Sequence, residues 1–225
     1  MFFWSENLLE SFLIKNKTKA TVLIFFSIFQ ICLSQNKISS KGGFISPISK
    51  SFEGQEPEAY WIWDSGDPNP KNYYLHIRKT INLNRLIKEA KVYVSAFSFA
   101  EIYINGVYID RVPTNPDPEY QTYEEIDISP YLKLGKNTIA ALVFNAGEGL
   151  HHRMNGRGGF FFQAKIIDFN EKIIKLNSDK SWLVTKAKAW DNNTDYRQVD
   201  HTIGRKEKYD ARLSFENWEQ NYFDD

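Results

Sequence analysis

EIYINGVYIDRV, residues 101–112, is the stretch that decides the fold. Apolar and polar residues alternate on both sides of Asn105-Gly106, and an Asn-Gly pair is the strongest short-range sign of a two-residue hairpin turn. The stretch therefore predicts two antiparallel strands joined by a tight turn that points into solvent.

Other strand-like runs surround this hairpin at regular spacing, with Gly, Pro and Asn clusters between them. They cover residues 60–63, 73–81, 91–97, 124–128, 138–144, 160–168, 171–176 and 181–185. Only NLNRLIKEA, residues 82–90, has a helical pattern, and it is short. We therefore predict an all-β domain over residues 59–225, a jelly-roll or galactose-binding-like β-sandwich with one short helix.

The alternation also predicts which side of each strand is buried. Side chains two residues apart lie on the same face of a strand, and two apolar faces can meet as stacked sheets. The residues predicted to face inward are Val92, Val94, Ala96, Ile102 and Ile104, while Tyr93 and Tyr103 are predicted to face the other way.

Composition restricts the classes of ligand. The chain has 225 residues, with 28 basic and 28 acidic residues interspersed, so it carries no electrostatic footprint for nucleic acid or anionic lipid. Neutral ligands are favoured. Aromatic residues make up 16% of the chain, which fits a sugar-binding surface but fits a sandwich core better.

The N-terminus has the pattern of an export signal. Three lysines at 15, 17 and 19 precede the apolar run 20–33, which is shorter than the roughly 20 residues that a membrane-spanning helix needs. We expect a signal sequence over residues 1–35 cleaved near Ser34, with residues 1–14 coming from an overextended start. Residues 36–58 form a flexible leader. The protein is then exported, to the periplasm or to the cell surface and medium.

The single cysteine, Cys32, lies inside that signal, and the bulky Ile31 before it disfavours a lipid anchor. The mature chain would have no cysteine, so its hydrophobic core alone must stabilise it.

Signatures of catalysis are absent from the sequence. There is no G-x-S-x-G elbow, phosphate loop or dinucleotide fingerprint. The glycines at 156–159 precede a strand and favour a close backbone approach or a bulge over a phosphate cradle. His151 and His152 are adjacent, which disfavours joint zinc ligation. They lie in the long loop 145–159, and loops of this length are usually functional or disordered.

An oxygen-rich cluster follows the last predicted strand. Asp191 and Asn192, with Asn193 and Asp195 close by, offer the ligands that calcium prefers. A solvated turn stabilised by the same side chains is the alternative, and it carries more weight.

Several blocks together resemble the N-terminal β-sandwich region of bacterial α-L-rhamnosidases, which are inverting glycoside hydrolases. They are WIW (61–63), YYLHIRKTINL (73–83), AKVYVSAFSFAEIYINGVYIDR (90–111), the DPEYQTYEEIDISPYLKLGKNTIAALVFNAGEG block (117–149), GRGGFFFQ (156–163) and KYDARLSFENW (208–218). The resemblance covers nearly all of residues 60–225.

The resemblance implies a module that precedes a catalytic domain and helps to recognise rhamnose-containing glycans, with calcium bridging sugar hydroxyls in some related modules. The catalytic domain of that family, an (α/α)-barrel with two catalytic carboxylates, has no counterpart in this chain, so no catalytic residue is carried over.

Sugar hydroxyls need carboxylates and planar amides, and the apolar face of a sugar needs an aromatic ring. The residues that we expect to bind substrate, all from loops beside the family blocks or after the last strand, are Asp117, Glu119, Tyr120, Asn145, Glu148 and Trp190. The alternative is that these residues cap turns or pack on a catalytic domain.

These observations predict a non-catalytic carbohydrate-recognition module that acts in the degradation of rhamnose-containing polysaccharide, alone or with a catalytic glycosidase domain or chain. Two alternatives stay open. One is a truncated part of an active α-L-rhamnosidase, and the other is a structural domain that packs on a partner catalytic domain.

Overall fold

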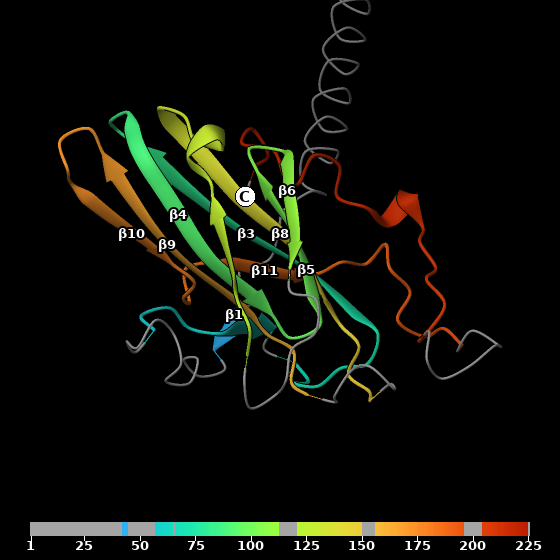
Figure 1. Cartoon of the computed structure of the whole chain (residues 1–225). Helices are drawn as coiled ribbons and strands as arrows, with labels where there is room; N and C mark the ends of the chain where they lie inside the picture. Colours follow the sequence, from blue (N-terminus) through green and yellow to red (C-terminus); the bar gives the residue numbers. More distant parts are fainter. Residues whose placement is uncertain are drawn as a thin grey trace, which may run out of the picture. The chain divides into compact units, whose positions relative to one another are not determined.

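Two antiparallel sheets pack face to face in the computed structural model (Figure 1). The structure describes residues 42–44, 57–64, 66–112, 121–149, 156–195 and 204–224. Apart from Asp224, these residues belong to one compact unit, Ile38–Phe223.

The first sheet, here the β8 sheet, has five strands. In spatial order they are β11 (Leu183–Lys186), β3 (Tyr73–Leu83), β8 (Gly135–Asn145), β5 (Phe99–Ile104) and β6 (Val107–Val112).

The second sheet, here the β9 sheet, has six strands. They run in the order β1 (Gly42–Phe44), β2 (Ile62–Asp64), β9 (Phe160–Asp168), β4 (Ile87–Ala96) and β7 (Glu124–Asp127), and β10 (Ile173–Asn177) also pairs with β9. The predicted β-sandwich is confirmed. Every strand predicted from the sequence is present, whereas β1 falls in the segment expected to be a flexible leader.

No α-helix occurs in the described part of the chain; two 3-10 turns, η1 (Ser129–Tyr131) and η2 (Ala211–Leu213), are the only helical elements there. None of the described helical elements is long and apolar enough to cross a membrane.

The helix predicted over residues 82–90 is wrong, because this segment joins β3 to β4. Ile87 pairs with Asp168 and Glu89 pairs with Ile167, so Lys88 is the extra residue of a β-bulge. The bulge shifts the alternation and turns residues 87 and 90 toward the core. Residue 83 is buried as well. Spacings of four and three are also those of a helical face, which explains the error.

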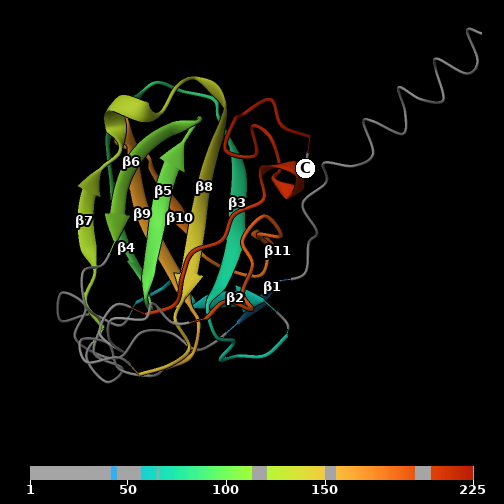
Figure 2. The same ribbon diagram turned by 90° about the vertical axis from the view of Figure 1, so that its right-hand side faces the viewer.

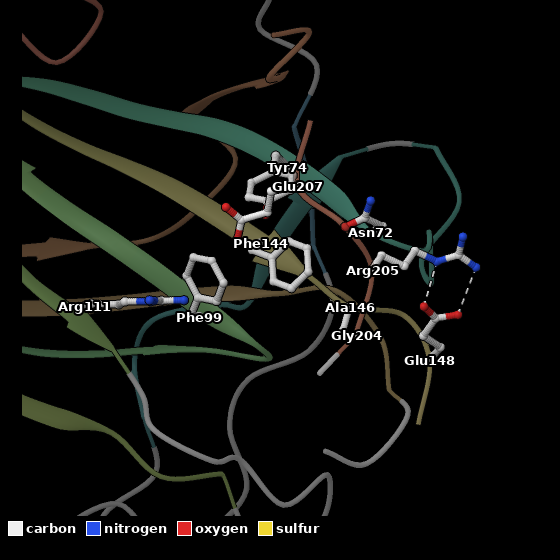
Figure 3. Close-up of a pocket in the computed structure, with 10 residues that line it drawn as sticks. All are labelled: Asn72, Tyr74, Phe99, Arg111, Phe144, Ala146, Glu148, Gly204, Arg205 and Glu207. Atoms are coloured by element: carbon white, nitrogen blue, oxygen red, sulfur yellow. Dashed lines mark hydrogen bonds and ion pairs between the residues drawn. The ribbon is translucent and has the colours of Figure 1, made fainter. Parts of the chain in front are cut away.

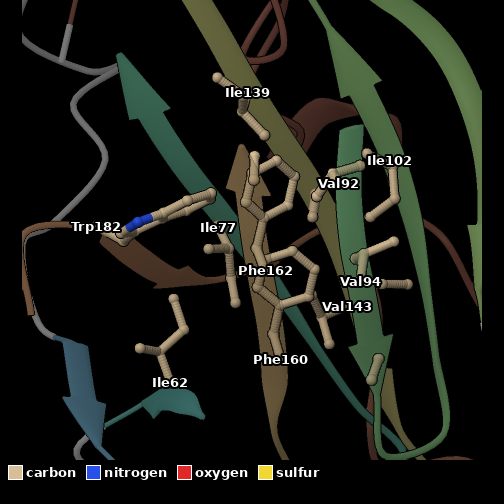
Figure 4. Close-up of a cluster of buried hydrophobic side chains, with 14 of the residues drawn as sticks. Ile62, Ile77, Val92, Val94, Ile102, Ile139, Val143, Phe160, Phe162 and Trp182 are labelled. Atoms are coloured by element: carbon tan, nitrogen blue, oxygen red, sulfur yellow. The ribbon is translucent and has the colours of Figure 1, made fainter. Parts of the chain in front are cut away.

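The main core lies between the sheets, and the alternation of the strands predicts it correctly. All five residues expected to face inward, from Val92 to Ile104, are fully buried. Phe160, Phe162 and Trp182 fill the centre, with the Trp182 ring 6.0 and 5.2 Å from the two phenyl rings (Figure 4). Burying a large apolar side chain of this kind stabilises the fold by about 1.5–3 kcal/mol.

The hairpin that joins β5 to β6 has the predicted turn. Asn105 and Gly106 have φ values of 52° and 84°, which favour asparagine and glycine. The turn is half-buried, however, rather than pointing into open solvent. The Asn105 side chain donates to Tyr131 O at 2.9 Å and accepts from Thr138 N at 3.0 Å. The side chain of Gln220 lies against Gly106, where an added Cβ would come within 2.0 Å of it.

The outer face of the β8 sheet is also buried. Inward residues of β8 alternate with outward ones that are just as apolar, namely Ala140, Leu142 and Phe144. The C-terminal segment, residues 204–223 and drawn in red in Figure 2, crosses this face and packs Trp218 and Phe223 against it. The β8 sheet therefore lies between two apolar layers, and the space left between it and the C-terminal segment forms the candidate site.

Candidate functional site

A row of aromatic rings crosses the outer face of the β8 sheet. Successive ring centroids lie 4.9, 4.6, 4.3 and 5.0 Å apart, and the row contains Phe99, Phe144, Tyr74, Trp190 and Tyr209. Three of these rings come from β5, β8 and β3, because outward side chains of paired strands lie next to each other. The other two come from the segment that follows β11, where Trp190 and Tyr209 form an isolated β-bridge.

The rings differ in what they can offer a ligand. Phe99, Phe144 and Tyr74 are at most 9% exposed, so their faces are used in packing against each other. Tyr74 also takes one face of Trp190, which stacks on it at 13°. Tyr209 is 51% exposed. The free aromatic surface of the row is therefore at the Trp190–Tyr209 end.

The row borders a hollow of about 540 Å³, here called the central groove. Its lining combines aromatic rings with hydrogen-bonding groups and a small apolar patch, and consists of His76, Glu101, Tyr103, Leu142, Ala189, Trp190, Glu207, Tyr209, Ser214 and Trp218. Apolar walls with a few polar groups are typical of small-molecule sites.

Two carboxylates lie in the central groove. Glu101 accepts a hydrogen bond from the Tyr103 hydroxyl at 3.1 Å, and burial together with this carboxylate raises the pKa of Tyr103 above its usual range. The hydroxyl therefore stays protonated and can hold Glu101 in place. Glu207 is exposed and forms no hydrogen bond or ion pair with other described residues, so its oxygens are available as acceptors.

His76 contributes a neutral group to the wall of the groove. It is 4% exposed, and burial lowers its pKa to about 3, so the imidazole is uncharged at neutral pH. Its ring packs against Trp218 with the centroids 4.2 Å apart. Its Nδ1 atom is enclosed without a hydrogen-bond partner in the described structure.

A smaller hollow of about 100 Å³ continues from the central groove toward the other end of the row (Figure 3). Glu207 lines both, and Arg111 lies over the Phe99 ring at 3.8 Å. Across the hollow from Phe99, Arg205 pairs with Glu148 through two hydrogen bonds of 2.8 and 3.2 Å. The Glu148 side chain is only 11% exposed, so this ion pair forms a wall of the hollow.

Of the six residues predicted to bind substrate, two line a hollow, one is buried in the fold, and three lie outside the described residues. Trp190 lies in the central groove and Glu148 in the smaller hollow. Asn145 is fully buried, where it donates to Pro70 O at 3.2 Å and lies 3.4 Å from Ser98 Oγ, so its amide joins loops of the fold. Three other predicted binding residues, Asp117, Glu119 and Tyr120, lie outside the described residues, as do His151 and His152.

Two lysines lie beside Asp191 and Asn192, the residues predicted to bind calcium. Lys208 Nζ lies 2.9 Å from Asp191 Oδ2, and Lys186 donates to Asn192 Oδ1 at 3.2 Å. Each of these oxygens thus has an ammonium group as its partner, and the calcium site stays a prediction. The pKa of Asp191 is lowered, chiefly by the hydrogen bond from Lys208. No three His, Cys, Asp or Glu side chains in the described part of the chain lie close enough together to hold a metal ion.

Sequence reasoning missed most of the groove. Glu101 and Tyr103 face outward on β5, but the sequence does not show that this face borders a hollow. Glu207 and Tyr209 lie in the C-terminal segment, where no periodic pattern shows which side chains face the sheet. The sequence pattern that could have pointed to them is an aromatic residue flanked by charged residues at 207–212.

The lining of the groove can bind a small ligand that has both polar and apolar surface. It offers ring faces, two carboxylates, a serine hydroxyl and a neutral imidazole on one side of a rigid sheet. Carboxylates accept from sugar hydroxyls, and aromatic rings pack on the C–H face of a sugar.

Comparison with known proteins gives a consistent result. A model of the α-L-rhamnosidase N-terminal domain matches residues 85–225. The α-L-rhamnosidase of Formosa agariphila is 23% identical over 168 residues, which cover 67% of this chain and 16% of that protein.

Two solved structures extend the comparison. The GH78 family rhamnosidase of Bacillus sp. GL1 is 28% identical with a TM-score of 0.65, over 76% of this chain and 18% of that one. The α-L-rhamnosidase of Dictyoglomus thermophilum is 25% identical with a TM-score of 0.55, over 82% of this chain and 19% of that one. The chain thus spans less than a fifth of the length of each of these three proteins.

Proposed function

The chain belongs to the α-L-rhamnosidase N-terminal domain family, and from this membership we propose that it is a non-catalytic module that recognises rhamnose-containing glycan in the central groove. The observation that carries the proposal is the lining of that groove. Exposed Tyr209, partly exposed Trp190 and the free carboxylate of Glu207 border the same hollow of about 540 Å³.

The chemistry of the sugar matches this lining. L-Rhamnose carries a methyl group in place of a primary hydroxyl, so one end of the sugar is apolar. Leu142 and Ala189 supply apolar surface in the groove for such a methyl group. The carboxylates of Glu207 and of Glu101, which pairs with Leu142 between β5 and β8, supply acceptors for the hydroxyls. The groove volume is in the range of small-ligand sites.

Titration calorimetry tests the proposal with L-rhamnose and a rhamnose-terminated oligosaccharide. We expect dissociation constants in the micromolar to millimolar range, as for small, solvent-exposed sites. Tyr209→Ala and Glu207→Gln should each weaken binding by about five- to twentyfold, since each removes a contact worth roughly 1–2 kcal/mol. Both side chains are exposed, so folding should persist.

The matched control is Tyr60→Ala, which removes a tyrosine of similar exposure, 45%, next to β2 of the other sheet. Its affinity should equal that of the unmodified chain. A folded protein with no heat of binding for either ligand would contradict the proposal, and equal losses in Tyr60→Ala and Tyr209→Ala would place the site elsewhere.

A second candidate function is docking on the catalytic domain of an α-L-rhamnosidase, and an exposed apolar patch favours it. Leu86 and Phe169 are 64% and 66% exposed. They adjoin the last pair of β4 and β9, Ile87 with Asp168, and so belong to the same end of the β9 sheet. Exposed apolar side chains that cluster often mark an interface.

Changing both residues to serine tests this docking function. The double variant should bind a separately produced α-L-rhamnosidase catalytic domain more weakly than the unmodified chain does, measured by titration calorimetry, and leave glycan affinity unchanged. Equal binding of that domain by both chains would contradict a role for the patch in docking.

Localisation follows from the same proposal. A module that binds polysaccharide must meet it outside the cytoplasm, in the periplasm or at the cell surface, as the predicted signal sequence over residues 1–35 implies. Replacing the lysines that precede the apolar run should retain the protein in the cytoplasmic fraction, and unchanged export would contradict this reading.

A further inference from the structure

A second hollow, of about 620 Å³, adjoins the central groove and has the opposite charge character. We call it the lysine hollow. Trp190 and Tyr209 line both the central groove and the lysine hollow, so these two rings stand at the border between them. A glycan that covers these rings therefore reaches both.

The lysine hollow has an excess of positive charge. Four cationic side chains line it, together with two carboxylates, and the charged residues are Lys186, Lys188, Lys208, Arg212, Asp191 and Asp210. The central groove has no cationic side chain among its described lining residues, but it has two carboxylates.

Ion pairs within the lysine hollow decide which charges remain for a ligand. Asp191 is paired with Lys208 at 2.9 Å. Asp210 is paired with Arg212 through contacts of 2.9 and 2.6 Å. Both carboxylates of the lining are thus neutralised by neighbours in the chain.

The remaining two lysines form no ion pair with a carboxylate of the described residues, although the charge of Lys186 helps to lower the pKa of Asp191. Lys186 donates to the uncharged amide of Asn192 at 3.2 Å and lies 5.2 Å from the Tyr73 ring. Lys188 is exposed and forms no hydrogen bond or ion pair with the described residues. These two ammonium groups are therefore the ones that can pair with an anion.

We infer that the lysine hollow binds an anionic substituent, a carboxylate or a sulfate, on the sugar unit next to the one held in the central groove. The inference rests on the proposed function and specifies its ligand as an acidic glycan. A carboxylate in the central groove repels an anion, whereas Lys186 and Lys188 attract one, so the charge pattern also orients the chain of sugars.

The test is titration calorimetry of the full chain with three oligosaccharides that share the same rhamnose terminus. One is neutral, one carries a uronic acid carboxylate on the adjacent unit, and one carries a sulfate there. We expect at least one charged ligand to bind about five- to twentyfold tighter than the neutral one at low salt, with the advantage reduced at high salt. The two charged ligands distinguish the anion.

Lys186→Gln combined with Lys188→Gln should remove most of that advantage, about fivefold or more, and leave the neutral ligand and the melting temperature unchanged. The matched control combines Lys165→Gln with Lys172→Gln, which removes two exposed lysines associated with the other sheet. This control should keep the full advantage.

The outcomes separate the two proposals. If all three ligands bind equally, or if the tighter binding of the charged ligands survives the Lys186 and Lys188 changes, the lysine hollow does not bind the anionic group. The proposed function then stands without this inference. If no ligand binds the folded chain, both proposals are overturned.

Discussion

Arg78 anchors the C-terminal segment that forms one wall of the central groove. The side chain is fully buried on the outer face of β3. Its guanidinium donates to the backbone oxygens of Trp218 at 2.7 Å, Gln220 at 2.8 Å and Phe223 at 3.2 Å. Arg78→Met would keep an apolar stem in place and remove all three donors.

The magnitude follows from these contacts. A hydrogen bond to a charged group contributes about 1.5–3 kcal/mol net. The three do not simply add, because the segment can leave the sheet once its anchor is gone, and its carbonyls then bind water. The loss is limited by the docking of Trp218 and Phe223, worth about 1.5–3 kcal/mol each. We expect the free energy of unfolding to fall by about 3–5 kcal/mol and the melting temperature by roughly 10 °C.

Two measurements check this prediction. Thermal unfolding gives the change in stability, and hydrogen exchange shows where it occurs. The Gln220 amide donates to Asn217 O and the Phe223 amide donates to Gln220 O, so both should exchange faster in Arg78→Met. Arg212→Met is the matched control, because that arginine is 88% exposed and should change stability by less than about 0.5 kcal/mol.

The reasoning would be refuted if Arg78→Met melted within about 1 °C of the unmodified chain and kept slow exchange at both amides. Loss of protection in the strands without loss in the C-terminal segment would also contradict it, since it would mean that Arg78 stabilises the sheet and not the segment.

Three further predictions concern single side chains. Gly106→Ala should lower the free energy of unfolding in urea by at least about 1 kcal/mol, because φ is 84° there and the added Cβ would meet the Gln220 side chain. Gln220→Ala removes that contact but not the backbone strain, so a loss of about 1 kcal/mol should remain in the double variant relative to Gln220→Ala alone, and a full recovery would contradict the prediction. Asn137→Leu should cost about 2–4 kcal/mol by the same assay, because this buried amide accepts from Lys133 N at 2.9 Å and donates to Lys133 O at 2.6 Å; a loss below about 1 kcal/mol would contradict the prediction. Burial lowers the pKa of His76 to about 3, so as the pH falls this side chain is protonated in the unfolded chain before it is protonated in the folded one. The free energy of unfolding should therefore fall by at most about 5 kcal/mol between pH 6.5 and 3. His76→Phe should remove this pH dependence, and identical pH profiles of the variant and the unmodified chain would contradict the prediction.

The strands could be predicted because each depends on local alternation. Asn105-Gly106 marked the hairpin, and the inward residues of β4 and β5 followed from a period of two. The helix prediction for residues 82–90 was wrong for a local reason as well. The bulge at Lys88 spaces the buried residues of this strand as they would be spaced on one face of a helix. Family membership was also within reach of the sequence, because the order of several blocks carries more information than any one motif.

The central groove depends on residues that are far apart in the chain. His76 lies on β3 and Glu101 on β5, two strands that flank β8 in one sheet. Other lining residues, among them Trp190, Glu207 and Trp218, come more than eighty residues later in the chain. No local sequence pattern shows that these residues come together, because they do so only when the C-terminal segment packs across the sheet.

The sequence by itself determined most of the strands and which side of β4 and β5 faces the core, since both follow from alternation along one strand. Only the tertiary structure decided that the other side of the β8 sheet is buried too, under a segment that Arg78 holds in place. The physical reason is that a second apolar face of a sheet must also be shielded from water by another part of the chain. Which distant segment packs on that face, and which hollows remain beside Trp190, depends on packing in three dimensions.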